Sequence, residues 1–158
     1  MRNLAARLGV APNALYSHVR GKDALLDELL DDLLAAIEPP SAETGDPVAG
    51  LRELMVSTYD LLLAHPDLVP LYLARQGARG PHAQRLGAIM DTLLARVGVA
   101  DPAVDDARRA LIVHAIGFAA FTVGSADGKA STAQLRDNYR RGLDWMLSGM
   151  LDRGATAR

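Results

Sequence analysis

Apolar residues recur at intervals of three and four along almost the whole chain, and this spacing limits the fold more than any other feature. Between residues 22 and 37 they form one continuous helical stripe: Leu25, Leu26, Leu29, Leu30, Leu33, Leu34 and Ile37. Leu and Ala dominate the apolar 49% of the chain, and the runs of β-branched residues that strands favour are missing. The sequence therefore predicts an all-α fold.

Proline and glycine mark where the helices begin and end. Pro47 follows Asp46 and Pro102 follows Asp101, which is the order expected of an N-cap and the first helical residue. Thr132 is expected to cap the last helix, and Gly98 lies just past the end of another. The expected helices cover residues 2–8, 12–19, 22–37, 47–64, 68–75, 81–97, 102–123 and 133–151.

A short segment rich in proline and glycine divides the chain. Residues 38–45 contain Pro39, Pro40 and Gly45 and are expected to form a linker. Residues 1–37 then form a small N-terminal domain with its connecting helix, residues 46–151 a larger helical domain, and residues 152–158 a flexible tail. The acidic side chains of the connecting helix are expected to face solvent: Asp27, Glu28, Asp31 and Asp32.

Composition and motif content exclude several classes of protein. Cysteine is absent, which removes disulfides, thiolate zinc sites and cysteine nucleophiles. No apolar run reaches the roughly 18 residues needed to cross a membrane, and the N-terminus has no signal-peptide core, so a cytoplasmic protein is expected. The histidines are dispersed, and no paired metal motif, phosphate loop or nucleophile elbow occurs. We therefore expect no catalytic residues, no metal and no cofactor.

Charge is distributed unevenly along the chain. The net charge is −2, yet residues 1–22 contain four basic residues and no acidic one, so this segment carries +4 and the remainder −6. The four are Arg2, Arg7, Arg20 and Lys22. Such asymmetry is typical of proteins with a nucleic-acid-binding end, although four cations in so short a segment also arise by chance.

The same segment has the layout of a helix-turn-helix, in which two short helices cross over a tight turn. Ala5 stands where the two helices would meet, and Gly9 where the chain must turn. Apolar residues are placed to fill the angle between the helices: Leu4, Leu8, Val10, Leu15 and Val19. The second helix would present short side chains that suit the major groove of DNA: Asn13, Ala14, Ser17 and His18. An ordinary helical hairpin is the alternative, but the local charge favours DNA binding.

Residues 4–26 resemble the signature of the TetR (tetracycline-repressor) family of transcriptional regulators. The core of the match is Leu15-Tyr16-Ser17-His18-Val19-Arg20-Gly21-Lys22, followed by an acidic, leucine-rich helix. The resemblance implies a base contact by Arg2, a recognition-helix tip at Pro12, Asn13 and Ala14, and contacts to the DNA backbone by Tyr16, Ser17, His18 and Lys22. Hydroxyl, imidazole and ammonium groups all bind phosphate. The alternatives are a core position for Tyr16 and a solvated His18.

The resemblance also implies a helix before this motif, packed under both of its helices, and the sequence starts at Met1 without one. The domain at residues 1–37 is therefore expected to be N-terminally incomplete. Either the native chain begins upstream of Met1, or this chain is a helical ligand-binding and dimerisation module without DNA-binding activity. A small all-helical enzyme is a third and weaker alternative.

The larger domain resembles the regulatory domain of the same family, which implies a ligand cavity among its helices. The residues expected to line it are Met55, Tyr59, Tyr72, Met90, His114, Phe118 and Phe121. Tyr72, His114 and Arg75 are candidate polar anchors, with ordinary core packing as the alternative for each. Glu38, Leu54 and Tyr72 stand where the family's namesake holds tetracycline and magnesium, so no metal–tetracycline site is expected.

Glycines seven residues apart share a face on each of the last two helices, Gly117 with Gly124 and Gly142 with Gly149. Glycine inside a helix costs about 0.5–1 kcal/mol relative to alanine, so a close approach of helices is expected there. The resemblance implies that these helices pair with those of a second subunit. The sequence thus predicts a homodimeric regulator, most often a repressor in this family, that binds a palindromic operator and is released by a small apolar effector.

Overall fold

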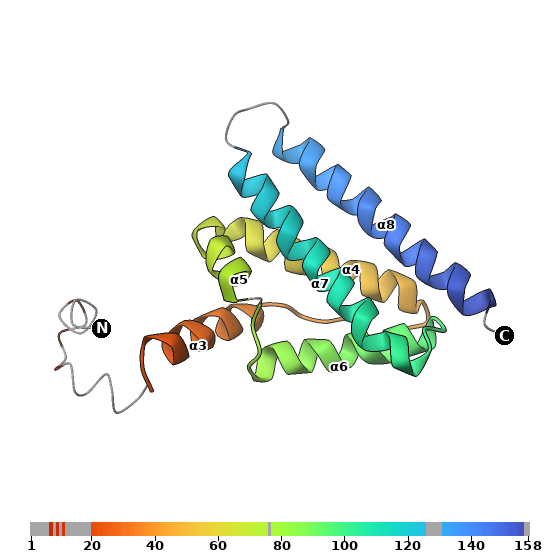
Figure 1. The fold of residues 1–158 in the computed structure, drawn as a ribbon, viewed down its shortest axis with the longest axis horizontal. Coiled ribbons are helices and arrows are strands. Elements are labelled where there is room, and N and C mark those ends of the chain that lie inside the picture. The colour runs from red at the N-terminus through yellow and green to blue at the C-terminus, as the bar shows by residue number, and fades with distance from the viewer. Residues whose placement is uncertain are drawn as a thin grey trace.

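The computed structural model describes residues 20–75, 77–125 and 131–156, together with the single positions 7, 9 and 11. From residue 151 onward it describes the backbone alone. All regular structure in this part of the chain is helical, which confirms the predicted all-α fold (Figure 1). The elements are α3 (Lys22–Leu34), α4 (Pro47–Ala64), the short 3₁₀ turn η1 (Pro66–Leu68), α5 (Val69–Arg75), α6 (Pro81–Arg96), α7 (Asp101–Gly124) and α8 (Thr132–Thr156).

Several helix ends follow the expected sequence signals. The side chain of Asp46 accepts a hydrogen bond of 2.9 Å from the backbone N–H of Ala49, and Pro47 opens α4. Gly98 follows α6 with a φ of 91°, a conformation that glycine adopts without steric cost. Local sequence therefore sets where these two helices begin or end.

Other helix ends differ from the expectation. Ala100, not Asp101, is the N-cap of α7, and its side chain makes no capping bond. Ser131 rather than Thr132 caps α8, because the Ser131 hydroxyl accepts from the N–H of Gln134 while the Gln134 side chain accepts from the N–H of Ser131. This reciprocal pair satisfies two backbone donors, which a threonine one position later would not do.

The first and last described helices also have different lengths from those predicted. Helix α3 ends at Leu34, and the chain continues to Ile37 through tighter bonds that link residues three apart. Ile37 is nevertheless buried together with Leu30 and Leu34, whereas Leu29 of the predicted stripe is 45% exposed, so only part of the stripe faces the core. Helix α8 extends to Thr156, past the expected end near residue 151 and into the segment predicted to be a tail. The flexibility of residues 152–158 stays a prediction.

Helix α7 is the centre of the fold. It packs against α4, α5 and α6, and α8 runs antiparallel along it (Figure 1). The largest fully buried side chains come from several helices: Leu30, Leu54, Tyr59, Leu93, Leu111 and Tyr139. Burial of this much apolar surface is the main source of stability in a domain of this size. Within the described part of the chain, α7 is long and apolar enough to cross a membrane by length and composition alone; 22% of its most apolar stretch is buried, and it packs against four other helices.

Candidate functional site

An apolar cavity of about 490 Å³ lies among α4, α5, α6 and α7. Its walls are mainly aliphatic side chains: Leu54, Met55, Leu86, Met90, Ile112 and Ile116. Small-molecule sites in proteins have volumes of roughly 300–1,000 Å³ and walls of this kind. The cavity therefore has the size and the lining of a site for a small, largely apolar ligand.

A few polar groups interrupt the apolar wall. The Thr58 hydroxyl donates a hydrogen bond of 2.8 Å to the carbonyl of Leu54, one turn earlier in α4. Arg108 of α7 forms an ion pair with Asp91 of α6 and a second, 2.7 Å long, with Asp105. One carboxylate oxygen of Asp91, Oδ1, is buried without a hydrogen-bond partner in the described part of the chain. The cavity thus has one charged end in a largely apolar surface.

Tyr72 of α5 joins the cavity to α3. Its ring lines the cavity and is almost fully buried, and its hydroxyl donates a hydrogen bond to the backbone carbonyl of Leu30 in α3. Burial raises the pKa of the Tyr72 hydroxyl, and the nearby carboxylate of Asp31 raises it further, so the group remains a donor at neutral pH. Leu34, at the end of α3, also lines the cavity. The end of the connecting helix is therefore part of the cavity wall.

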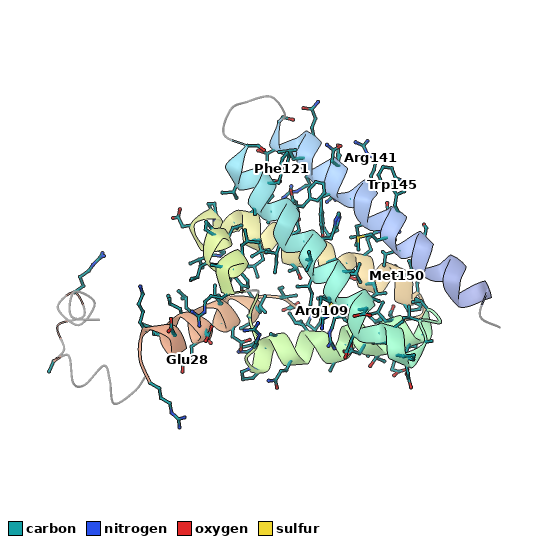
Figure 2. The ribbon with its side chains drawn as sticks, in the orientation of Figure 1. Glu28, Arg109, Phe121, Arg141, Trp145 and Met150 are labelled. Atoms are coloured by element: carbon teal, nitrogen blue, oxygen red, sulfur yellow. The ribbon has the colours of Figure 1, made fainter. Side chains whose placement is uncertain are left out.

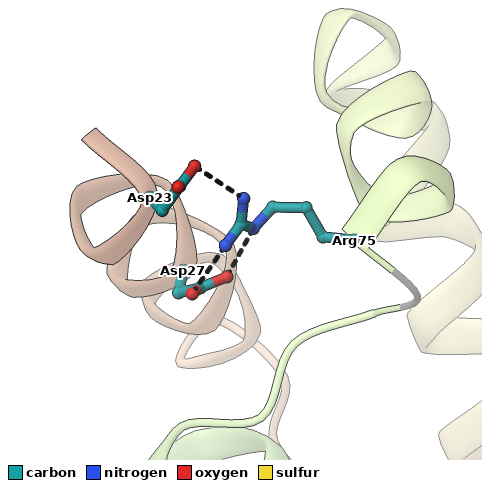
Figure 3. A network of polar contacts seen from close by, with 3 residues as sticks. All are labelled: Asp23, Asp27 and Arg75. Carbon is teal, nitrogen blue, oxygen red and sulfur yellow. Dashed lines mark hydrogen bonds and ion pairs between the residues drawn. The ribbon is translucent and has the colours of Figure 1, made fainter. Parts of the chain in front are cut away.

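A second contact holds the other end of α3 to α5 (Figure 3). The guanidinium of Arg75 makes two bonds to Asp27, with Nε 2.5 Å from Oδ1 and Nη2 2.8 Å from Oδ2. Its Nη1 lies 3.2 Å from Oδ1 of Asp23, one turn earlier in α3. The hydrogen bond from Arg75 lowers the pKa of the Asp27 carboxyl. The contact is exposed to solvent and is therefore screened by salt.

A third contact joins α3 to the start of α6. Asp31 accepts hydrogen bonds from the backbone N–H groups of His82, at 3.0 Å, and Ala83, at 2.9 Å. A carboxylate is favourable here, since these N–H groups have no partner within their own helix and the helix dipole is positive at this end. Asp31 is only 4% exposed, so the expectation that it faces solvent is wrong. Its partners lie about fifty residues away, and helix periodicity gives no signal for such a contact.

The residues expected to line a ligand pocket fall into two groups. Met55, Tyr72 and Met90 line the cavity. Tyr59, His114 and Phe118 instead join Tyr139 of α8 in an aromatic cluster between α4, α7 and α8, with the Tyr59 and Tyr139 ring centroids 4.0 Å apart.

The hydroxyls of this cluster are satisfied within the chain. Tyr139 donates to the carbonyl of Met55, and Tyr59 bonds to Thr122, each at 2.8 Å. The aromatic cluster is therefore part of the core, as the alternative of ordinary core packing predicted. Phe121 lies elsewhere and is 62% exposed, and Arg75 contacts α3 rather than the cavity.

Three of the four glycines expected at the dimer interface, Gly117, Gly124 and Gly149, are exposed on α7 and α8, whereas Gly142 faces α7 within the chain, so its expected place at the interface is wrong. A Cβ atom added at Gly117, Gly124 or Gly149 would meet nothing within 4 Å, whereas at Gly142 it would lie 2.8 Å from Cε1 of His114. Gly142 therefore allows close packing of α8 on α7 within the chain. We call the exposed residues of this region the α7–α8 face: Val113, Gly117, Phe121, Gly124, Trp145 and Gly149. Figure 2 shows Phe121 and Trp145 on these two helices.

Of the residues expected to bind DNA, Lys22 alone is described, and it is exposed as the first residue of α3. The expected positions Arg2, Pro12, Asn13, Ala14, Tyr16, Ser17 and His18 lie outside the described residues. Within the described part of the chain, no group of three or more histidine, aspartate or glutamate side chains is placed to hold a metal ion.

The fold and the sequence match known regulators over nearly the whole chain. The HTH-type transcriptional repressor DrrR1 of Streptomyces coeruleorubidus is 30% identical over 156 residues, which are 98% of this chain and 57% of the repressor. The chain thus spans little more than half the length of that curated relative. No protein-family model matches the chain.

Solved structures share the arrangement of helices. A TetR protein of Acinetobacter baumannii, in complex with minocycline, superposes with a TM-score of 0.81 at 25% identity, covering 97% of this chain and 85% of that one. The TetR-family protein ActR of Streptomyces coelicolor, in complex with (S)-DNPA, has a TM-score of 0.81 at 22% identity and covers 97% and 87%. At 22% identity, the similarity to ActR shows a shared fold and no more.

The fold and the cavity define a class of helical proteins in which a connecting helix forms part of the wall of a ligand-sized cavity. In fold the chain is similar to the TetR-family regulators among the solved structures, and in sequence it is similar to the transcriptional repressor DrrR1.

Proposed function

We propose that this chain is a ligand-responsive transcriptional regulator, and specifically a repressor that a small apolar effector releases from its operator. The observation that carries the proposal is the double contact of Tyr72, which lines the cavity and donates a hydrogen bond to Leu30 of α3. The matched relatives support it, since DrrR1 is a repressor and the solved relatives hold minocycline or (S)-DNPA.

A ligand in the cavity would act through α3. It would contact Tyr72 and Leu34 and so favour a different position of the helix that leads to residues 1–22. This mechanism is allosteric because DNA and ligand would prefer different positions of α3. In the absence of ligand, the contacts of Asp27 with Arg75 and of Asp31 with α6 hold the helix in the described position.

We further propose that the chain acts as a homodimer through the α7–α8 face. Val113, Gly117, Phe121 and Gly124 recur at helical spacing along α7, and Val113 and Phe121 are each 62% exposed. Trp145 on α8 is 75% exposed. Exposed apolar stripes of this kind mark interaction sites, and a two-fold pairing of the same face on both copies gives a closed dimer. Such a dimer would match a palindromic operator.

The DNA-binding part of the proposal rests on residues 1–22. Lys22 is exposed and is the first residue of α3. The residue before it, Gly21, has no side chain, so the ammonium group of Lys22 can reach a phosphate. The remaining proposed contacts are Arg2 at a base, Pro12, Asn13 and Ala14 at the tip of the recognition helix, and Tyr16, Ser17 and His18 at phosphates. A regulator of this kind works in the cytoplasm, where the DNA is.

The proposal is tested by fluorescence anisotropy with labelled DNA that flanks the chain's own gene. We expect binding that saturates at two chains per duplex and is at least tenfold tighter than binding to shuffled DNA of the same composition. Because phosphate contacts release counterions, the affinity should fall steeply between 50 and 200 mM salt, by about tenfold or more. Equal affinity for flanking and shuffled DNA, or no binding, would contradict the proposal and favour a binding module without DNA activity.

A further inference from the structure

The charged end of the cavity carries information on the chemistry of the ligand. Three charged side chains line the cavity, Asp91, Arg108 and Arg79, and Arg79 is exposed to solvent at its edge. Among the neutral polar groups, Thr58 and Tyr72 already donate their hydroxyl hydrogens to backbone carbonyls, and Gln84, exposed to solvent, donates its amide N–H to the carbonyl of Arg79. The pair of Asp91 and Arg108 is therefore the part of the wall with which a polar group of a ligand would interact most strongly.

This pair keeps both an acceptor and donors for a ligand. Arg108 uses one N–H of Nη1 for Asp91 and one of Nη2 for Asp105, out of the five N–H groups of a guanidinium. Asp91 accepts through Oδ2, and its Oδ1 has no partner in the described part of the chain. Neither side chain is fully covered, since Asp91 is 36% and Arg108 29% exposed, but Oδ1 of Asp91 is itself enclosed, so a ligand can approach this carboxylate only at Oδ2, which can accept a second hydrogen bond. Gly87 leaves room beside Arg108, because a Cβ atom there would stay 3.9 Å from its Cδ and Nη1.

The combination of an acceptor and a donor of opposite charge selects among ligand groups. A hydroxyl group can donate to Asp91 and accept from Arg108 at the same time. A carboxylate would be repelled by Asp91 and Asp105, an ammonium group would be repelled by Arg108, and an ether has no hydrogen to donate to Asp91.

We infer that the cavity takes a neutral, largely apolar molecule whose alcohol or phenol hydroxyl binds between Asp91 and Arg108. This inference rests on the proposed function, since it assigns the chemistry of the effector. The aliphatic walls alone predict an apolar ligand. The charged pair adds that this ligand has a hydroxyl group at the end that lies against α6 and α7.

The first test compares four fluorescent probes on the unaltered chain without DNA. 1-Hydroxypyrene, 1-methoxypyrene, 1-pyrenecarboxylate and 1-pyrenemethylammonium share one apolar body and differ in the polar group. We expect 1-hydroxypyrene to bind tightest, with an affinity about tenfold or more above that of 1-methoxypyrene. A difference of this size corresponds to the free energy of one hydrogen bond to a charged group. Equal binding of these two probes, or tighter binding of either charged probe, would overturn the inference.

The second test removes the charged pair as a whole, so that the one carboxylate that loses a partner is that of Asp105, whose side chain is 74% exposed to solvent. In the double variant D91A/R108A the preference for 1-hydroxypyrene over 1-methoxypyrene should fall to less than about threefold. The matched control is R52A/D144A, which removes a 2.7 Å ion pair between α4 and α8 away from the cavity. The control should keep the full preference. A preference that survives in D91A/R108A would overturn the inference.

The outcomes separate this inference from the proposed function. Binding of all four probes without the expected order contradicts the hydroxyl assignment and leaves the cavity as a ligand site. Failure of all four probes to bind contradicts both the assignment and the effector part of the proposed function. The DNA-binding part is read by anisotropy in a separate experiment.

Discussion

The carboxylate of Asp31 occupies the space that the missing side chain of Gly80 leaves open. A Cβ atom at Gly80 would overlap Cγ and Oδ2 of Asp31 and would lie 2.9 Å from its Cβ. Asp31 is fixed in this place by the N–H groups of His82 and Ala83 at the start of α6. The position of the connecting helix α3 relative to α6 therefore depends on a residue with no side chain.

Gly80→Ala should lower the free energy of unfolding by about 1–3 kcal/mol, because Asp31 must move away from its two donors or the backbone must shift. Chemical denaturation followed by circular dichroism measures this change. The matched control is Gly45→Ala, because nothing lies within 4 Å of a Cβ atom there. Equal stability of the two variants would show that Asp31 and Gly80 are not in the contact described.

Asp31→Ala should lower the free energy of unfolding by about 1–3 kcal/mol, since it leaves two N–H groups at the partly buried start of α6 without their acceptor. Asp32→Ala is the control, because Asp32 is the exposed neighbour on the same helix. Its effect should stay within about 0.5 kcal/mol. The measurement is thermal unfolding at constant pH, and a larger loss for Asp32→Ala than for Asp31→Ala would contradict the account.

Arg75→Gln should raise the pKa of Asp27 toward the ordinary value of 3.8, since the hydrogen bond from Arg75 is the largest cause of its lowering. A lowered carboxyl pKa in the folded state stabilises the fold above the pKa of the unfolded chain. This stabilisation is lost as the pH falls below about 4 and through the lowered value. Titration of the Asp27 carboxyl carbon by NMR reads the pKa directly, and an unchanged value in the variant would argue against the pair.

Phe121→Lys should weaken the proposed dimer by at least about tenfold, because it places a charge in the α7–α8 face. Leu73→Lys is the control, as Leu73 is 56% exposed on α5 and lies outside this face. Sedimentation velocity over a range of concentrations distinguishes monomer from dimer. Dimers of unchanged affinity in Phe121→Lys, or a monomeric unaltered chain at micromolar concentration, would refute the proposed interface.

Much of the fold was predictable from local sequence, because its signals act within one helix. The apolar stripe from Leu25 to Ile37 predicted the burial of Leu30, Leu34 and Ile37 but not the exposure of Leu29, and Asp46 with Pro47 predicted the start of α4. Where a neighbouring residue competes for the same role, local signals give the wrong position, as when Ser131 rather than Thr132 caps α8.

The candidate site was predictable only in part, since it depends on contacts between distant segments. Met55, Tyr72 and Met90 line the cavity, and their role in ligand binding stays a prediction. The charged pair of Asp91 and Arg108 was missed because neither residue belongs to a motif. The burial of Asp31 was missed because nothing in the sequence of α3 distinguishes it from the other acidic residues of this helix, which are exposed.

The central claim is that the state of the cavity controls DNA binding through Tyr72 and α3. The most direct test measures the affinity for the DNA flanking the chain's own gene by anisotropy, with and without saturating 1-hydroxypyrene, for the unaltered chain and for Tyr72→Phe. Allosteric coupling energies of about 1–3 kcal/mol correspond to changes of roughly 5- to 150-fold. We predict that the probe weakens DNA binding by at least about fivefold in the unaltered chain and by less in Tyr72→Phe, which lacks the hydrogen bond to Leu30. An unchanged DNA affinity with the cavity filled would contradict the account.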